Sequence, residues 1–171
     1  KMWALQSGEL IMSGDGHKGW LSGVAFSPEG RKLASCAEDG TVKIWDFEAS
    51  VCSATLVEHT QACWDLAYMT DTPEFVVSCS MDHTAKLWDL VVGRCRQTFR
   101  GHVDSVNAGV FQPYANNIAT ASGDKTVSLW DCRSGLGTLT FSGHKNAVSS
   151  VDFALQGDTI ASCDADGTMR V

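Results

Sequence analysis

The chain has 171 residues, a formal net charge of -7 and 44% hydrophobic residues. This apolar fraction can supply a core, which excludes a wholly disordered chain. No run approaches the roughly 20 uncharged apolar residues that cross a bilayer, so we expect no membrane partner. The 13 basic residues are scattered along the sequence, and nucleic acid is bound by clustered positive charge, so we expect no nucleic-acid partner either.

Two series of dipeptides divide the chain into repeats. A Gly-His or Glu-His pair begins at positions 16, 58, 101 and 143, and a Trp-Asp pair begins at positions 45, 88 and 130. A period of 42 or 43 residues predicts a repeat architecture. We assign residues 1–15 to the end of a preceding blade, and residues 16–57, 58–100, 101–142 and 143–171 to four successive repeats, of which the last is incomplete.

The first element is the end of a Trp-bearing strand, since Trp3 stands 42 residues before Trp45. The last repeat ends one residue before the position of a fourth Trp, so we expect both ends of the chain to lie inside strands. Domain boundaries usually fall in exposed linkers, which indicates that the chain is part of a longer protein. The alternative is a closed ring of four blades.

Each repeat contains the same succession of short β segments. An alternating run follows the His and ends in an aromatic residue at the ninth position. A strand of small residues comes next, at 32–36, 75–79, 118–121 and 159–163. An Asp-x-Thr turn then leads into the Trp strand, as is typical of a hairpin. A fourth segment lies at 51–57, 95–99 and 137–141. Four strands per repeat of this length, without any helical period, predict an all-β fold of propeller blades.

A His, a hydroxyl residue, an Asp and a Trp recur at nearly equal offsets in the repeats. The members are His17, Ser35, Asp39, Trp45; His59, Ser78, Asp82, Trp88; His102, Thr120, Asp124, Trp130; and His144, Ser162, Asp166. Ser, His and Asp are the residue types of a nucleophilic triad. An active site is a single location, however, whereas this set is repeated in every unit. We therefore expect a structural network of mutually satisfied polar groups, and no enzyme.

The other chemical motifs are weak. The seven cysteines form no Cys-x-x-Cys pair, so we expect reduced thiols that fill small apolar slots. Residues 164–167 resemble the start of a calcium loop but lack its downstream Glu. His83 stands in the turn position that other repeats give to Gly or Lys, and we expect it to be exposed. We therefore predict no cofactor and no metal site.

These repeated motifs resemble the WD-repeat β-propeller family across the whole chain. The resemblance implies about four visible blades of a larger, seven-bladed propeller. Glu58 in place of Gly before His59, and Ala4 in place of Asp after Trp3, depart from the family pattern.

Four segments are similar to an axonemal central-apparatus WD-repeat protein of the sperm-associated antigen type. They are Asp82 to Asp89, Arg94 to Asn107, Ala119 to Asp131 and Ala161 to Gly167. That similarity implies a non-catalytic scaffold in the cytoskeleton of a motile cilium or flagellum, within a larger multiprotein assembly that includes central-apparatus components. The alternative is a cytosolic adaptor, such as a ubiquitin-ligase substrate receptor or a coat and trafficking component.

The resemblance also implies that protein partners bind where the inner strands begin. The candidate partner-binding residues at these positions are Trp20, Ser22, Glu38, Trp64, Met81, Asn107 and Ser149. Trp20 and Trp64 are the two Trp residues outside the Trp-Asp phase, which makes them plausible interface anchors. The alternative for either one is packing against a neighbouring blade. None of these positions is Arg, which disfavours a reader of phosphorylated segments.

Overall fold

A computed structural model describes residues 1–171, and the chain is built entirely from strands and turns. The strands are β1 Met2–Trp3, β2 Leu10–Met12, β3 Leu21–Phe26, β4 Lys32–Ala37, β5 Thr41–Asp46, β6 Val51–Val57, β7 Cys63–Tyr68, β8 Phe75–Ser80, β9 Thr84–Asp89, β10 Arg94–Arg100, β11 Val106–Phe111, β12 Asn117–Ser122, β13 Val127–Asp131, β14 Gly137–Phe141, β15 Val148–Phe153, β16 Ile160–Asp164 and β17 Met169–Arg170. The prediction of an all-β fold is confirmed. The structure contains no helix that is long and apolar enough to cross a membrane.

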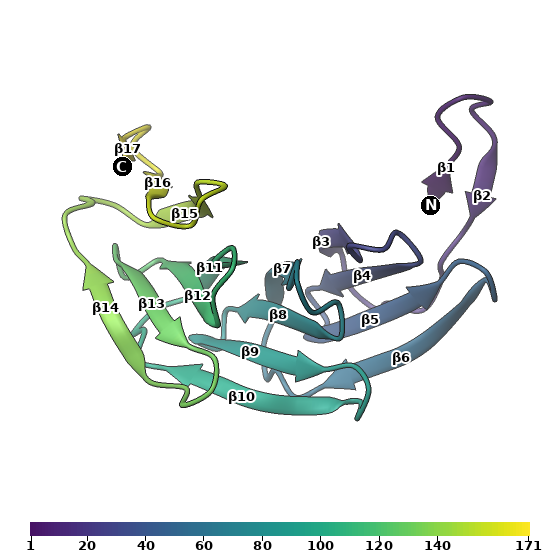
Figure 1. Ribbon diagram of the computed structural model, residues 1–171, viewed down its shortest axis with the longest axis horizontal. Helices are drawn as coiled ribbons and strands as arrows, with labels where there is room; N and C mark the ends of the chain where they lie inside the picture. The colour runs from purple at the N-terminus through teal and green to yellow at the C-terminus, as the bar shows by residue number, and fades with distance from the viewer.

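The strands form antiparallel sheets that follow the order of the chain. Blade 1 is β3-β4-β5-β6, blade 2 is β7-β8-β9-β10, blade 3 is β11-β12-β13-β14, and blade 4 is β15-β16-β17. The blades follow one another around an open arc, with the β1-β2 pair at one end and blade 4 at the other (Figure 1). β1 and β17 belong to different sheets, so the alternative of a closed four-bladed ring is wrong for this structure.

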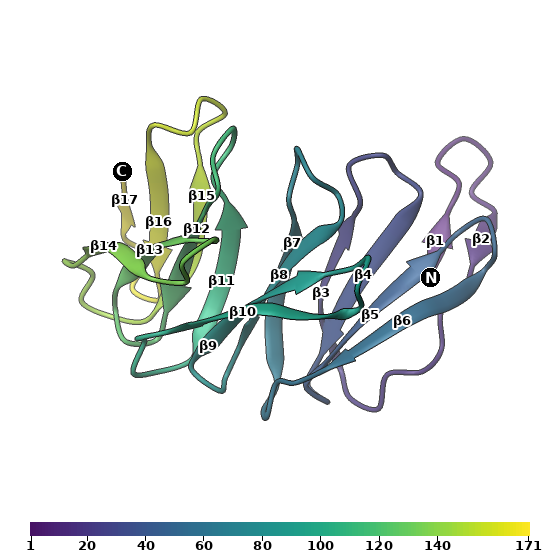
Figure 2. The ribbon, with the colours of Figure 1, turned by 60° about the horizontal axis from the view of Figure 1, so that its bottom comes forward.

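The inner strands of the blades lie side by side. β3 packs against β7, β7 against β11, and β11 against β15. Figure 2 shows these inner strands in succession along the arc. Each inner strand contains a β-bulge where it pairs with the next strand of its blade. In β3 this bulge lies between Leu21 and Gly23. A bulge re-aims the side chains near the start of the strand, which is where the candidate partner-binding residues lie.

Local backbone geometry explains the turn sequences. The residue after each turn Asp has a left-handed φ: 74° at Gly40, 66° at His83, 73° at Lys125 and 79° at Gly167. Glycine adopts this conformation without steric cost, and the other residue types adopt it at some cost. His83 is exposed, as expected from its position in the turn.

The apolar core lies between blades, and no single sheet encloses it. One cluster joins blades 1 and 2 and includes Val42, Leu66 and Trp88. A second joins blades 2 and 3, and a third joins blades 3 and 4. Because each blade buries its faces against its neighbours, stability is shared along the arc, as in other repeat proteins.

Candidate functional site

The polar network of blade 2 is a continuous chain of hydrogen bonds. The indole Nε1–H of Trp88 donates to Ser78 Oγ at 2.7 Å, and Ser78 Oγ lies 2.8 Å from His59 Nε2. On the other side of the ring, His59 Nδ1 lies 2.8 Å from Asp82 Oδ2. A neutral imidazole satisfies every partner if its Nδ1–H donates to Asp82 and its Nε2 accepts from Ser78. Both Trp88 and Ser78 are fully buried.

Blades 1 and 3 contain the same chain of contacts. Trp130 Nε1 donates to Thr120 Oγ1 at 2.7 Å, and His102 lies 2.8 Å from that oxygen and 2.7 Å from Asp124 Oδ2. In blade 1, the Trp45 and His17 contacts to Ser35 are each 2.8 Å. The His17 contact to Asp39 is longer, at 3.4 Å. The structure thus brings together the predicted network residues of these three repeats.

In repeat 4 the predicted residue Asp166 lies outside the network, and Asp164 occupies its place. His144 lies 2.9 Å from Ser162 Oγ and 2.8 Å from Asp164 Oδ2. Asp166 instead accepts a hydrogen bond from Asn146 Nδ2 at 2.9 Å. Asp164 stands in the register position that Ser80 and Ser122 fill in blades 2 and 3. Its longer side chain reaches the imidazole and also caps the backbone N–H groups of the turn.

The network carboxylates tie the inter-blade loop to the hairpin turn. Burial opposes the ionisation of Asp39, but hydrogen bonds from the Lys18 N–H, from Thr41 and from His17 outweigh it and lower the pKa of this carboxyl to about 2. Burial likewise opposes ionisation of Asp82, and hydrogen bonds from His59 and Thr84 lower its pKa further. These aspartates therefore remain ionised well below neutral pH.

The arrangement is suited to structural support and not to nucleophilic catalysis. A nucleophile must be open to its substrate, whereas Ser35, Ser78 and Thr120 are at most 1% exposed and already accept an indole N–H. Three equivalent copies of the full set provide the same bracing in three blades. We therefore interpret the set as a folding element.

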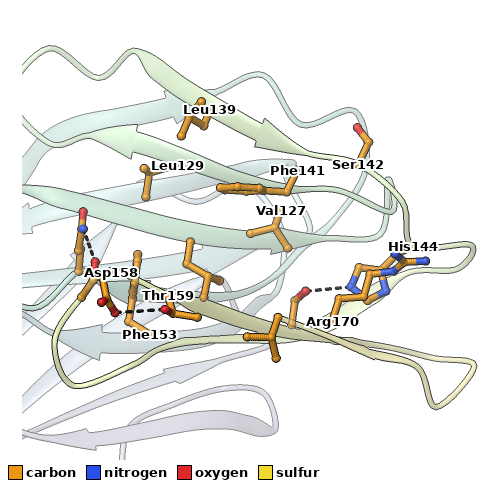
Figure 3. A pocket seen from close by; sticks show the side chains of 15 residues that line it. Val127, Leu129, Leu139, Phe141, Ser142, His144, Phe153, Asp158, Thr159 and Arg170 are labelled. Atoms are coloured by element: carbon orange, nitrogen blue, oxygen red, sulfur yellow. Dashed lines mark hydrogen bonds between the residues drawn. The ribbon is translucent and has the colours of Figure 1, made fainter.

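A cavity of about 510 Å³ lies between blades 3 and 4. Figure 3 shows Val127, Leu129 and Phe141 on one side of it and Phe153 and Arg170 on the other. His144 and Ser162 also line it.

The packing of a Trp ring in blade 3 shows what occupies the equivalent space there. There, the Trp130 ring packs 6.0 Å from the ring of Phe99 and 5.8 Å from that of His102. Phe141 and His144 hold the equivalent positions at the cavity, and residues 143–171 contain no Trp. The cavity corresponds to the space that a Trp ring fills in the other blades, so we do not interpret it as a substrate site.

Six of the seven candidate partner-binding residues divide into two groups, the first of which faces outward. The backbone N–H of Glu38 donates to the carbonyl of Trp20, and that of Met81 donates to the carbonyl of Ala62, at 2.9 Å each. These backbone bonds hold the start of each inner strand against the hairpin turn and leave the side chains exposed. Trp20 is 80% exposed and Met81 is 46% exposed. Glu38 is exposed as well.

The second group reaches across blade boundaries. Ser22 donates to the carbonyl of Cys63, and Trp64 Nε1 donates to Ser105 Oγ at 3.0 Å. Asn107 Nδ2 donates to the carbonyl of Val148 at 2.8 Å. For Trp64, the contact supports the packing alternative over that of a free anchor. A partner at these three positions would have to displace the contacts that join successive blades.

Ser149 stands at the equivalent position of blade 4 and is exposed. It bonds within its own blade, to the carbonyl of Cys163 at 3.2 Å. Ser149 makes no hydrogen bond to a neighbouring blade that a partner would have to displace, so its role in partner binding stays a prediction.

Sequence reasoning missed the ion pair that accompanies Glu58. The other repeats have glycine before the His, with φ between 140° and 156° at Gly16, Gly101 and Gly143. Glu58 does not adopt a positive φ, and its Oε2 lies 3.6 Å from Nζ of the buried Lys86. The sequence contained a signal for this ion pair. Glu58 replaces the glycine of the other repeats, and its negative charge can pair with Lys86 on the Trp-bearing strand.

The chain matches a family model along nearly all of its length. The WD40 model, described as "WD domain, G-beta repeat", matches residues 8–46, 50–89, 93–131 and 136–171. Among curated proteins, a periodic tryptophan protein 2 homolog of Caenorhabditis elegans is 39% identical over 59 residues, which is 34% of this chain and 6% of that protein. A protein LST8 homolog of Dictyostelium discoideum is 56% identical over 41 residues, or 24% of this chain and 14% of that protein.

A further relative is nuclear distribution protein PAC1-2 of Uncinocarpus reesii, which is 39% identical over 54 residues, or 32% of this chain and 12% of that protein. The matched segments thus span no more than about a seventh of any of these three relatives' own length. The family match, the repeated Trp-Ser-His-Asp network and the four antiparallel sheets agree. This chain belongs to the WD40 repeat family.

Proposed function

We propose that the chain is a non-catalytic scaffold that binds other proteins through the surface around Trp20. The observation that carries the proposal is the exposure of this indole, 80%, at the start of an inner strand. Trp is enriched among the residues that dominate binding energy at protein interfaces, because its large apolar area becomes desolvated on binding.

The finer proposal is that this scaffold acts in the central apparatus of a motile axoneme, within the cytoskeleton. It rests on the similarity of the segments 82–89, 94–107, 119–131 and 161–167 to an axonemal WD-repeat protein. The net charge of -7 disfavours direct adhesion to an acidic microtubule surface, so attachment would run through other proteins. The microtubule association in this proposal is therefore indirect.

Affinity capture of a tagged protein from ciliated cells tests the role of Trp20. We expect Trp20→Ala to lose co-purified proteins while retaining the thermal midpoint of the unaltered protein. Leu155→Ala is the matched control, since Leu155 is 89% exposed but follows the far end of its inner strand. Trp64→Ala should instead lower the thermal midpoint, because it removes a contact between blades 2 and 3. Equal recovery of partners by Trp20→Ala and the control would refute the proposed surface.

Localisation and salt extraction test the axonemal part separately. We expect the tagged protein along the axoneme, and we expect salt to release it together with other proteins. A purely cytosolic distribution would favour the adaptor alternative. Release of this protein alone at mild ionic strength, with every partner left behind, would contradict attachment through shared protein interfaces.

A further inference from the structure

A narrow groove lies between blades 2 and 3, at the end of the inner strands opposite to Trp20. Trp20 precedes β3, whereas Met69, which lines the groove, follows the end of β7. The groove has a volume of about 100 Å³ and an apolar floor that includes Met69, Phe75, Leu87 and Phe111. Arg96 and Arg133 line it from the two blades. This space is sufficient for about one aliphatic side chain.

Arg96 is held at the groove by weak contacts that leave it accessible. Its guanidinium carbon lies 5.1 Å from the centre of the Phe75 ring, and its Nη1 lies 3.8 Å from Asp89 Oδ2. The side chain is 58% exposed, and exposed ion pairs contribute little to stability. An incoming carboxylate could therefore pair with Arg96 without breaking a contact that folding requires.

The equivalent positions of the other blades do not form such a site. Ser53 and Thr138 occupy the register position of Arg96, and each hydroxyl donates at 3.1 Å to a carbonyl of its own blade. The position of Arg133 is Val91 in blade 2. The combination of an apolar floor with an Arg from each blade is thus particular to the junction of blades 2 and 3.

Two of the six arginines lie at this groove. Arg96 and Arg133 line the groove, and each has an acidic residue near it, Asp89 and Asp131. In a chain of net charge -7, two arginine side chains beside an apolar groove are complementary to an acidic ligand.

We propose that the groove binds a short acidic segment of a partner protein. An aliphatic side chain of the segment enters the groove, and flanking carboxylates pair with Arg96 and Arg133. The apolar floor favours a peptide over a nucleic acid, which would offer phosphates but no aliphatic side chain. The surface is separate from the one around Trp20, and the proposal does not depend on that one.

Fluorescence anisotropy with labelled hexapeptides tests the proposal on the intact protein. The probe is Glu-Glu-Asp-Leu-Glu-Glu, and the comparison peptides replace its Leu by Gly or its acidic residues by Lys. We expect the probe to bind, and we expect both comparison peptides to bind more weakly. Arg96→Glu and Arg133→Glu should each weaken binding about tenfold, because each replaces an attraction by a repulsion. Arg31→Glu is the matched control, since it makes the same charge change on blade 1.

A second measurement locates the peptide. With methyl-labelled methionine, binding should shift the NMR signal of Met69 and leave that of Met12 unchanged, because Met12 lies beside blade 1. Several results would overturn the proposal: no binding of the probe, equal binding of the Gly peptide, equal weakening by Arg31→Glu, or an unmoved Met69 signal. Tighter binding of a thymidine oligonucleotide of similar length would assign the groove to nucleic acid instead.

Discussion

Replacing Thr120 by Val removes one hydroxyl from the centre of the blade 3 network while conserving the volume of the side chain. Thr120 is fully buried, and its Oγ1 lies 2.7 Å from Trp130 Nε1 and 2.8 Å from His102 Nε2. The substitution leaves both groups buried without a partner. Each buried unsatisfied group costs about 1–3 kcal/mol, so we expect the free energy of unfolding to fall by about 2–6 kcal/mol.

Thr120→Ser is the matched control, because it keeps the hydroxyl and matches the Ser of the other repeats. It removes only one methyl group, for which we expect a cost of about 1 kcal/mol. Equilibrium unfolding in urea, followed by Trp fluorescence, gives both values. If the two variants lost equal stability, the hydroxyl would have no stabilising role, and the structural interpretation of the repeated network would be refuted.

Three further predictions concern single positions. Asp164→Ala should lower the thermal midpoint more than Asp166→Ala does, since Asp164 pairs with the imidazole of blade 4; the reverse order would restore Asp166 to the network. Tyr68→Phe should stabilise the protein by about 1 kcal/mol in urea unfolding, because the buried Tyr68 hydroxyl has no hydrogen-bond partner and the other repeats have Phe at this position. The pKa of Asp39 falls from 3.8 to about 2 on folding, and that of Asp82 is also lowered, so the contribution of these groups to stability should be constant above about pH 5 and decline as the pH falls towards about 2; a stability that did not decline in this interval would contradict the lowered pKa values.

The repeat period was sufficient to predict the blades and most members of the polar network. Each repeat places a His, a hydroxyl and a Trp at nearly fixed offsets, and antiparallel pairing then brings them together. The error at Asp166 has a physical cause. Two aspartates stand two residues apart in the last turn, and both point towards the same loop. Which of the two contacts His144 depends on the positions of their side chains in the hairpin, and the spacing of residues in the sequence does not determine those positions.

The roles of Ser22, Trp64 and Asn107 were harder to predict because they depend on contacts between blades. Each donates to a group 41 residues later in the chain, which is close to one repeat. A period therefore indicates which residues face each other across a blade boundary, provided that the blades are assumed to pack in register. Reasoning that treats each repeat separately assigns such polar residues to the surface. The basic groove was missed for the same reason, since Arg96 and Arg133 belong to different repeats.

The two proposed surfaces together bear on how such a scaffold would work. Trp20 belongs to blade 1, and the groove lies between blades 2 and 3 at the opposite end of the inner strands, so a partner at one surface leaves the other open. Ser22 and the first core cluster connect blade 1 rigidly to blade 2. A protein bound at Trp20 and an acidic segment bound in the groove would therefore be held in a fixed relation without any conformational change. The binding energies should then be additive, and Trp20→Ala should leave the affinity for the acidic hexapeptide unchanged. A weakened affinity in that variant would show that the Trp20 surface and the groove are coupled. The protein would then be described as an allosteric scaffold and not as a rigid one.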